Sequence, residues 1–267
     1  MAGSATNKVG VIGAGKIGGS LIQRLSESGG FDLTVSDVHA EQLDRFARGY
    51  GVKTTSSNLE AAKAADILVV AVKPWDVGTI LDEAAPAFDD TTKAVVSVAA
   101  GVPIKVIAAR LPEGAAVLRV MPNVCAAVGL GSAVVAANGP GEAHVAAVMD
   151  IFAHVGDVME LPERLFDAAT ALHGSGPAYV ALFADSLIQA GVREGIPRDV
   201  ARRLVNQTIG GTAVLLKERA AHQIRDEVMT PGGTTAAAFV AMEKAGFVAA
   251  VYDGIEAATV QARRLAE

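Results

Sequence analysis

The first 160 residues alternate short apolar, β-branched runs with segments of helical spacing. Strands are predicted at six of these runs: Lys8–Ile12, Leu33–Ser36, Ile67–Val72, Ala94–Val98, Ala116–Val120 and Ser132–Ala136. Helices are predicted between the first four strands, over Ile17–Ser28, Ala40–Gly49 and Asp76–Ala87. Because strand–helix alternation is typical of a parallel sheet with helices on both faces, we expect a doubly wound α/β domain.

From Pro162 onward, long Ala- and Leu-rich segments with helical spacing replace this alternation. Glycine and proline interrupt them at Gly174–Pro177, Gly195–Pro197, Pro231–Gly233 and Gly246. The pattern predicts one domain over residues 1–160 and an all-α domain over residues 161–267. Since Val200–Leu216 and Ala236–Ala250 carry few charges, we expect a second copy of the chain to cover them. A self-contained helical bundle is the alternative.

The net charge and the number of cysteines restrict which binding partners and which cellular compartment we expect. The formal net charge is −6 without a long basic run, which argues against nucleic acid as a partner. The longest apolar runs have the length of strands, so no membrane partner is expected. One cysteine, Cys125, excludes a disulfide within the chain, and the N-terminus lacks a signal-peptide pattern. A cytoplasmic location is therefore expected.

A glycine-rich turn follows the first predicted strand and opens the first predicted helix. It reads Gly13-Ala14-Gly15-Lys16-Ile17-Gly18. Glycines at this spacing permit a tight turn, close approach to a pyrophosphate and close packing of the helix on the strand. Asp37 ends the second strand, where a carboxylate accepts hydrogen bonds from a ribose hydroxyl. In this context the turn predicts a dinucleotide site.

Three further segments leave predicted strands at the same edge of the sheet. They are Ala71–Pro74, Ser97–Gly101 and Arg119–Asn123. Ligands of open α/β sheets bind at the carboxyl ends of the strands. The three segments together therefore predict a cleft lined for a cofactor.

Two turns interrupt the helical half. Thr230–Thr235 contains two glycines directly before a helix predicted from Ala236 to Lys244. Unblocked N–H groups at a helix N-terminus bind a small anion such as a carboxylate, and a threonine N-cap is the alternative. The other turn, His173–Tyr179, is either a helix–helix junction or a place where a ligand or another backbone approaches closely.

In this order and spacing the segments resemble the pyrroline-5-carboxylate reductase family, from Val9 to about Ala262. Its most specific parts are Ala71–Pro74, Ala99–Val102, Met121–Asn123, Gly174–Tyr179 and Pro231–Thr235. The resemblance implies a Rossmann-type domain followed by a helical dimerisation domain, in a homodimer or a larger homo-oligomer built on dimers. It also implies that NAD(P)H reduces a small cyclic imino acid, 1-pyrroline-5-carboxylate, to L-proline in the last step of proline biosynthesis.

The same resemblance implies roles for individual residues. Cofactor contacts are implied for Gly13, Gly15, Lys16, Ile17, Gly18, Ser36, Asp37, Asn58, Ala71, Val72, Lys73, Pro74 and Ala99. Substrate contacts are implied for Gly233, Thr234 and Thr235 and, more loosely, for Glu163 and Glu227. Thr235 is the implied catalytic residue, because its hydroxyl would hydrogen-bond the imine nitrogen.

The chain also departs from the family pattern. His173 and Thr230 stand where serine is usual, Val124 and Cys125 replace a Thr-Pro pair, and the residue at Glu227 varies. We predict that His173 packs at a helix end and is not a catalytic acid. These departures leave open a related cyclic imine as the substrate.

Other function classes also stay open. A hydroxyacid dehydrogenase of the 3-hydroxyisobutyrate or 6-phosphogluconate type would have a lysine after the inter-domain glycine motif, and residues 174–194 contain none. A protein that senses NAD(P) without turnover would not need a carboxylate-binding turn. No metal site is expected, because the five histidines lack ligand spacing. Asp37 slightly favours NADH, whereas the family commonly accepts NADPH, so both cofactors stay open.

Overall fold

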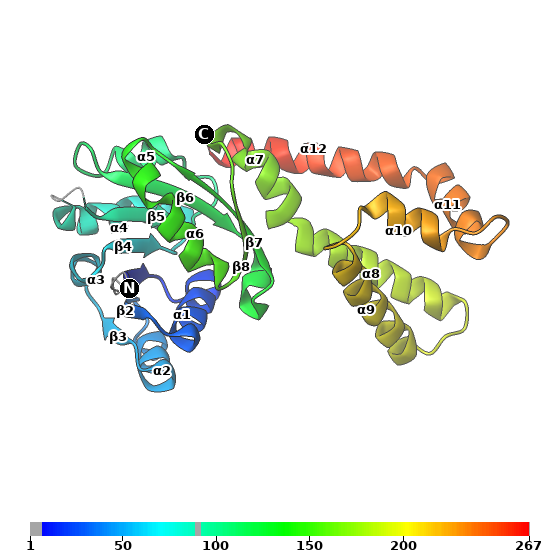
Figure 1. The fold of residues 1–267 in the computed structure, drawn as a ribbon, viewed down its shortest axis with the longest axis horizontal. Helices are drawn as coiled ribbons and strands as arrows, with labels where there is room; N and C mark the ends of the chain where they lie inside the picture. Colours follow the sequence, from blue (N-terminus) through cyan, green and yellow to red (C-terminus); the bar gives the residue numbers. More distant parts are fainter. Residues whose placement is uncertain (1–6, 89–91, 267) are drawn as a thin grey trace. The chain divides into compact units, whose positions relative to one another are not determined.

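The computed structural model describes residues 7–88 and 92–266 and divides into two compact units (Figure 1). The first unit contains Met1–Ser175 together with Ala258–Glu267, and the second contains Gly176–Ala257. The sequence-based domain boundary between residues 160 and 161 stays a prediction.

An eight-stranded sheet forms the centre of the described part of the first unit, in the order β3-β2-β1-β4-β5-β6-β7-β8. Its strands are β1 (Asn7–Ile12), β2 (Phe31–Ser36), β3 (Lys53–Thr55), β4 (Ile67–Val70), β5 (Ala94–Ser97), β6 (Ala116–Pro122), β7 (Gly131–Ala137) and β8 (Gly156–Glu160). Neighbouring described strands run parallel, except that β6 and β7 are antiparallel. The predicted doubly wound α/β class is confirmed.

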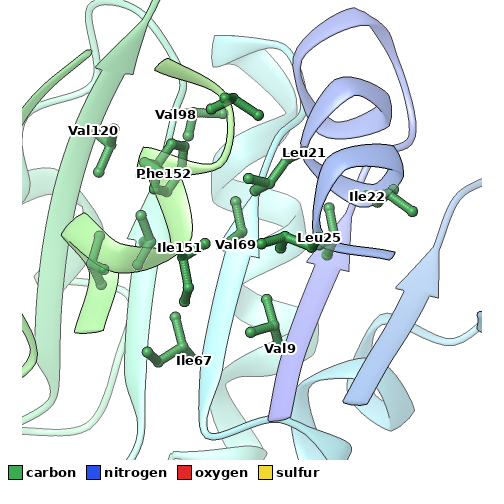
Figure 2. Packing of buried hydrophobic residues seen from close by; sticks show 14 of the residues in the cluster. Val9, Leu21, Ile22, Leu25, Ile67, Val69, Val98, Val120, Ile151 and Phe152 are labelled. Carbon is green, nitrogen blue, oxygen red and sulfur yellow. The ribbon is translucent and has the colours of Figure 1, made fainter. Parts of the chain in front are cut away.

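Helices cover both faces of this sheet. One face carries α1 (Lys16–Ser28), α2 (Ala40–Tyr50) and α6 (Val145–Ala153), and the other carries α3 (Asn58–Ala64), α4 (Val77–Ala84) and α5 (Ile104–Ala108). Figure 2 shows the first face, where Leu21 and Leu25 of α1 lie near Val9 and Val69, and Phe152 of α6 lies near Val98. An apolar core lies on each face of the sheet. Successive strand residues belong to these two cores in turn, because successive side chains of a strand point to opposite faces.

Short helical segments lie in the connections between these elements and after β8. They are η1 (Pro74–Asp76), η2 (Ala85–Ala87), η3 (Val124–Val128), η4 (Pro140–His144), η5 (Glu163–Leu165), α7 (Phe166–Ala169) and η6 (Thr170–Gly174). The helix predicted over Asp76–Ala87 is thus divided among η1, α4 and η2.

The second unit is helical throughout. It contains α8 (Gly176–Arg193), α9 (Arg198–Leu215), α10 (Ala221–Val228), α11 (Thr234–Lys244) and the larger part of α12 (Phe247–Leu265). No residue of α8, α11 or α12 is buried, and large apolar side chains such as Leu182, Phe183 and Val248 are exposed. Because tertiary packing supplies most of a helix's stability, these apolar faces require a further surface to cover them.

No single helix among the described residues has the length and apolar composition to cross a membrane. The pair α11 and α12, bent by 53° at the break between them, passes the same test on length and composition alone.

Candidate functional site

The glycine-rich turn between β1 and α1 needs two of its glycines, Gly13 and Gly18, for steric reasons. Gly13 has a φ of +98°, and a Cβ there would lie 2.6 Å from the carbonyl oxygen of Ala71. A Cβ on Gly18 would overlap the carbonyl oxygen of Gly13, whereas no described atom lies within 4 Å of the Cβ position of Gly15. The N-cap residue of α1 is Gly15, which has no side chain to accept hydrogen bonds from the first N–H groups, and the first turn contains no acid. The turn therefore offers open N–H groups to an anion.

The Asp37 carboxylate connects this turn to the end of β2 through a hydrogen bond. Its Oδ2 accepts a hydrogen bond from the Ala14 N–H at 2.7 Å. Its Oδ1 accepts one from the His39 N–H at 2.8 Å and lies 2.9 Å from His39 Nδ1. The side chain is only 9% exposed, but Oδ2 keeps a second lone pair for a ribose hydroxyl. The choice between NADH and NADPH stays open.

The hydrogen bonds of Asp37 predict a pH-dependent contribution to stability. Burial raises the pKa of the Asp37 carboxyl, but the hydrogen bonds from Ala14 and His39 lower it more, so that the pKa lies below its ordinary value of 3.8. A lowered folded-state pKa stabilises the protein above the unfolded-state pKa, and this stabilisation is lost as the pH falls through the folded-state value. We expect Asp37→Asn to lower the free energy of unfolding near neutral pH by about 1–2 kcal/mol.

Urea unfolding of wild type and Asp37→Asn measures this difference near neutral pH and again below about pH 4, where it should shrink. Asp44→Asn is the matched control, because Asp44 pairs with Arg48 on the exposed side of α2 and should contribute little. A deficit in Asp37→Asn that is the same at both pH values would contradict the assignment.

The side chains of Ser36, at the end of β2, and Asn58, at the start of α3, are hydrogen-bonded to each other. The buried Ser36 hydroxyl donates to Asn58 Oδ1 at 2.7 Å, and Asn58 Nδ2 donates to Glu83 Oε2 at 2.7 Å. These two bonds fix the orientation of the Asn58 amide. The ribose contacts implied for Ser36 and Asn58 stay predictions.

The remaining residues that the resemblance implies for the cofactor follow two neighbouring strands at one edge of the sheet. Ala71, Val72, Lys73 and Pro74 follow β4, and Ala99 follows β5. In the parallel register Val70 pairs with Ile12 on one side and with Ser97 on the other, so the ends of β1, β4 and β5 coincide. The sheet therefore brings these residues to the same carboxyl edge as the glycine-rich turn, as the sequence predicted.

His173 lies where the helical segment η6 meets the end of β6. Its Nε2 is 2.8 Å from the Met121 carbonyl oxygen, and its Nδ1 is 2.5 Å from the Ala169 carbonyl oxygen. The Asn123 side chain donates to the His173 carbonyl at 3.0 Å. Because main-chain oxygens occupy both ring nitrogens, this geometry supports a packing role over that of a catalytic acid.

Glu163 accepts hydrogen bonds that the sequence did not indicate. Its Oε1 accepts from the Ile104 N–H at the start of α5 at 2.7 Å and from Arg119 Nη1 at 3.2 Å. Arg119 is 4% exposed, and its guanidinium lies 4.9 Å from the ring centroid of Phe166. Glu163 thus compensates a buried charge. The substrate contact implied for Glu163 stays a prediction.

The turn before α11 has the open form that the sequence predicted. Gly232 has a φ of +69°, and the Gly233 N–H donates to the Thr230 carbonyl at 3.0 Å. A Cβ on Gly233 would overlap the Thr230 hydroxyl. Gly233 itself is the N-cap, without a side-chain hydrogen bond, so the alternative of a threonine N-cap is wrong. Of the first four N–H groups of the helix, Gly233 already donates within the turn, so those of Thr234, Thr235 and Ala236 stay open.

Glu227 lies on α10, where its Oε2 pairs with Arg219 Nη1, and its side chain is largely exposed. It belongs to the second unit, together with Gly233, Thr234 and Thr235, whereas the residues implied for the cofactor belong to the first unit. The substrate contact implied for Glu227 stays a prediction.

Two family models match the chain. Residues 163–265 match the model described as pyrroline-5-carboxylate reductase dimerisation, and residues 8–101 match that of the coenzyme F420-dependent NADP oxidoreductases.

Similar proteins span almost the whole chain. A pyrroline-5-carboxylate reductase of Synechocystis sp. is 38% identical over 264 residues, which cover 97% of this chain and 98% of the relative. The solved structure of a pyrroline-5-carboxylate reductase from Coxiella burnetii matches with a TM-score of 0.94 at 29% identity, covering 98% of this chain and 99% of that one. The Plasmodium falciparum enzyme, solved with NADP bound, matches with a TM-score of 0.83 at 31% identity and covers 98% of both chains.

Proposed function

The chain belongs to the pyrroline-5-carboxylate reductase family, and from this premise we propose that it reduces 1-pyrroline-5-carboxylate to L-proline with NAD(P)H, the last step of proline biosynthesis. The observation that carries the proposal is the N-terminus of α11, which follows Gly232 and Gly233 and whose first N–H groups have no side-chain cap. A hydroxyacid dehydrogenase lacks support because residues 174–194 contain no lysine, and a sensor would not need this turn.

The residues of the first unit fit a nicotinamide dinucleotide. The open N–H groups at Gly15 and at the start of α1 would hold the pyrophosphate, and Asp37 would accept from the adenosine ribose. The residues from Ala71 to Pro74, together with Ala99, would border the nicotinamide half. When bound, the cofactor supplies the hydride.

The second unit would hold the substrate. The N–H groups of Thr234 and Thr235 would bind the substrate carboxylate at the start of α11. The Thr235 hydroxyl would hydrogen-bond the imine nitrogen, which is protonated when the imine is most electrophilic. Two anchor points on a small ring orient one face of it toward the hydride donor.

We also propose that the helical unit forms the interface of a homodimer or of a larger assembly of dimers. Support comes from the match of residues 163–265 to a dimerisation family and from the lack of buried residues along α8, α11 and α12. Each active site would then take its α11 turn from the partner subunit. The net negative charge and the single cysteine support a cytoplasmic enzyme that acts on a small molecule.

The purified protein should oxidise NADH or NADPH only when a cyclic imino acid is added. The decisive measurement is the initial rate with 1-pyrroline-5-carboxylate, compared with a six-membered cyclic imine carboxylate. Oxidation of 3-hydroxyisobutyrate and of 6-phosphogluconate by NAD(P)⁺ is the control. Turnover of either hydroxyacid without turnover of 1-pyrroline-5-carboxylate would refute the proposed function, and binding of NAD(P)H without any turnover would indicate a sensor.

A further inference from the structure

The Glu163 carboxylate connects two segments that lie far from it in the chain. Its Oε1 accepts a hydrogen bond from the Ile104 N–H at 2.7 Å and another from Arg119 Nη1 at 3.2 Å. Ile104 is the first residue of α5, and Arg119 lies in β6. All three residues belong to the first unit. One carboxylate oxygen therefore joins the start of a helix to a strand of the sheet.

Arg119 needs this partner because its side chain is buried. Only 4% of the residue is exposed, and its guanidinium lies 4.9 Å from the centroid of the fully buried Phe166 ring. Its Nε has no hydrogen-bond partner among the described residues. A buried charge is costly unless an opposite charge compensates it. Glu163, whose side chain is 31% exposed, supplies the opposite charge.

The Ile104 N–H needs an acceptor from outside its own helix. The first four N–H groups of an α-helix have no carbonyl partner within it. The N-cap of α5 is Pro103, whose side chain offers no hydrogen-bond acceptor. Ile104 is buried, and a buried N–H without an acceptor costs free energy. Glu163 therefore caps α5 from a position 59 residues further along the chain.

The segment of residues 98–103, which connects β5 to α5, starts and ends beside this pair. It leaves β5 after Ser97, which is the register partner of Arg119 in the neighbouring strand. It ends where the Ile104 N–H donates to the Glu163 carboxylate. Since that carboxylate is bonded to Arg119, both ends of the segment are held against β6.

We propose that Glu163 is a positioning residue, which fixes residues 98–103 and through them one border of the nicotinamide site. The inference rests on the proposed function, in which Ala99 borders the nicotinamide half of the cofactor. Glu163 acts through Ile104 and Arg119 and does not touch the substrate. Loss of the Ile104 bond should release the segment and weaken the binding of the nicotinamide half. The turn after β1, which would hold the pyrophosphate, is connected to Asp37 instead.

Two double variants separate this role from the stability of the ion pair. Arg119→Met with Glu163→Gln replaces both charges by neutral side chains of similar shape and keeps an oxygen that accepts from the Ile104 N–H. Arg119→Met with Glu163→Ala also removes both charges, but it removes that acceptor as well. Neither leaves a buried charge without its partner, which would itself destabilise the fold. The single variants Glu163→Gln and Glu163→Ala give the same comparison if Arg119→Met folds poorly.

Calorimetric titration with NADH and with ADP-ribose, which lacks the nicotinamide, measures the effect on each half of the cofactor. We expect the alanine double variant to bind NADH roughly three- to tenfold more weakly than the glutamine double variant, because they differ by about one hydrogen bond. ADP-ribose should bind to both with the same Kd. Equal affinities for NADH, or an equal loss of affinity for ADP-ribose, would overturn the proposal.

Asp82→Asn is the matched control, because Asp82 Oδ2 pairs with Arg110 Nη1 beyond the other end of α5 and both side chains are about half exposed. It should leave both Kd values unchanged. Neither titration requires turnover, so a failure of the proposed function would not affect this test. If the alanine double variant instead had a higher KM for the imine and an unchanged Kd for NADH, Glu163 would be a substrate contact and the proposal would be wrong.

Discussion

Thr235→Ala should lower kcat by roughly 10- to 1,000-fold, because a single positioned hydrogen bond at a reacting centre contributes this much. Thr235 lies in the first turn of α11, within the second unit, whereas the residues that would hold the cofactor lie in the first. The affinity for NAD(P)H should therefore stay nearly unchanged. Steady-state rates with 1-pyrroline-5-carboxylate give kcat, and the fluorescence of bound NAD(P)H gives the cofactor Kd.

Two variants at the same turn distinguish chemistry from folding. Thr235→Ser keeps the hydroxyl and should recover much of the rate, whereas Thr234→Ala removes the neighbouring exposed hydroxyl and should change kcat little. An unchanged rate in Thr235→Ala would remove this residue from the mechanism. A parallel loss of cofactor affinity would mean that the substitution disturbs more than one hydrogen bond.

The central strands could be predicted from the sequence because their environment leaves a strong pattern. Every residue of β4 and β5 is buried, and a strand covered on both faces is apolar throughout. The strands β3 and β8 were missed because they lie at the two edges of the sheet and are largely exposed, so their polar residues resemble loops. The antiparallel pairing of β7 follows from the short connection over residues 123–130, which is too short for a crossover helix.

Some features of the candidate site follow from the local sequence, whereas others depend on residues that are far apart in the chain. The backbone needs of Gly13, Gly18 and Gly233 follow from local turns, and the glycine spacing in the sequence already indicated those turns. The side-chain partners did not follow from the sequence. Asp37 with Ala14, Arg119 with Glu163 and His173 with Met121 are separated by 23, 44 and 52 residues. No local pattern encodes such pairs, because the path of the chain through the fold brings them together.

Mixing two impaired variants, Gly15→Glu and Thr235→Ala, should raise the activity above that of either variant alone if each site takes its substrate turn from the partner subunit. The Cβ position of Gly15 has no described atom within 4 Å, so a glutamate should be accommodated without unfolding the turn. Its carboxylate would occupy the place of the pyrophosphate and repel it. Gly15→Ala is the matched control, because it adds a Cβ without the charge and should keep more of the cofactor affinity.

The expected activity follows from counting sites in a dimer with twofold symmetry. A mixed dimer has one site that combines both substitutions and another that combines an intact glycine turn with an intact Thr235. Random mixing makes half of the dimers mixed, so about a quarter of the wild-type activity should return. If the cofactor half and Thr235 of one chain formed a site together, every site would carry one substitution and no activity would return. Differently tagged subunits verify that mixed dimers form, so the absence of activity in them would assign both halves of the site to a single chain.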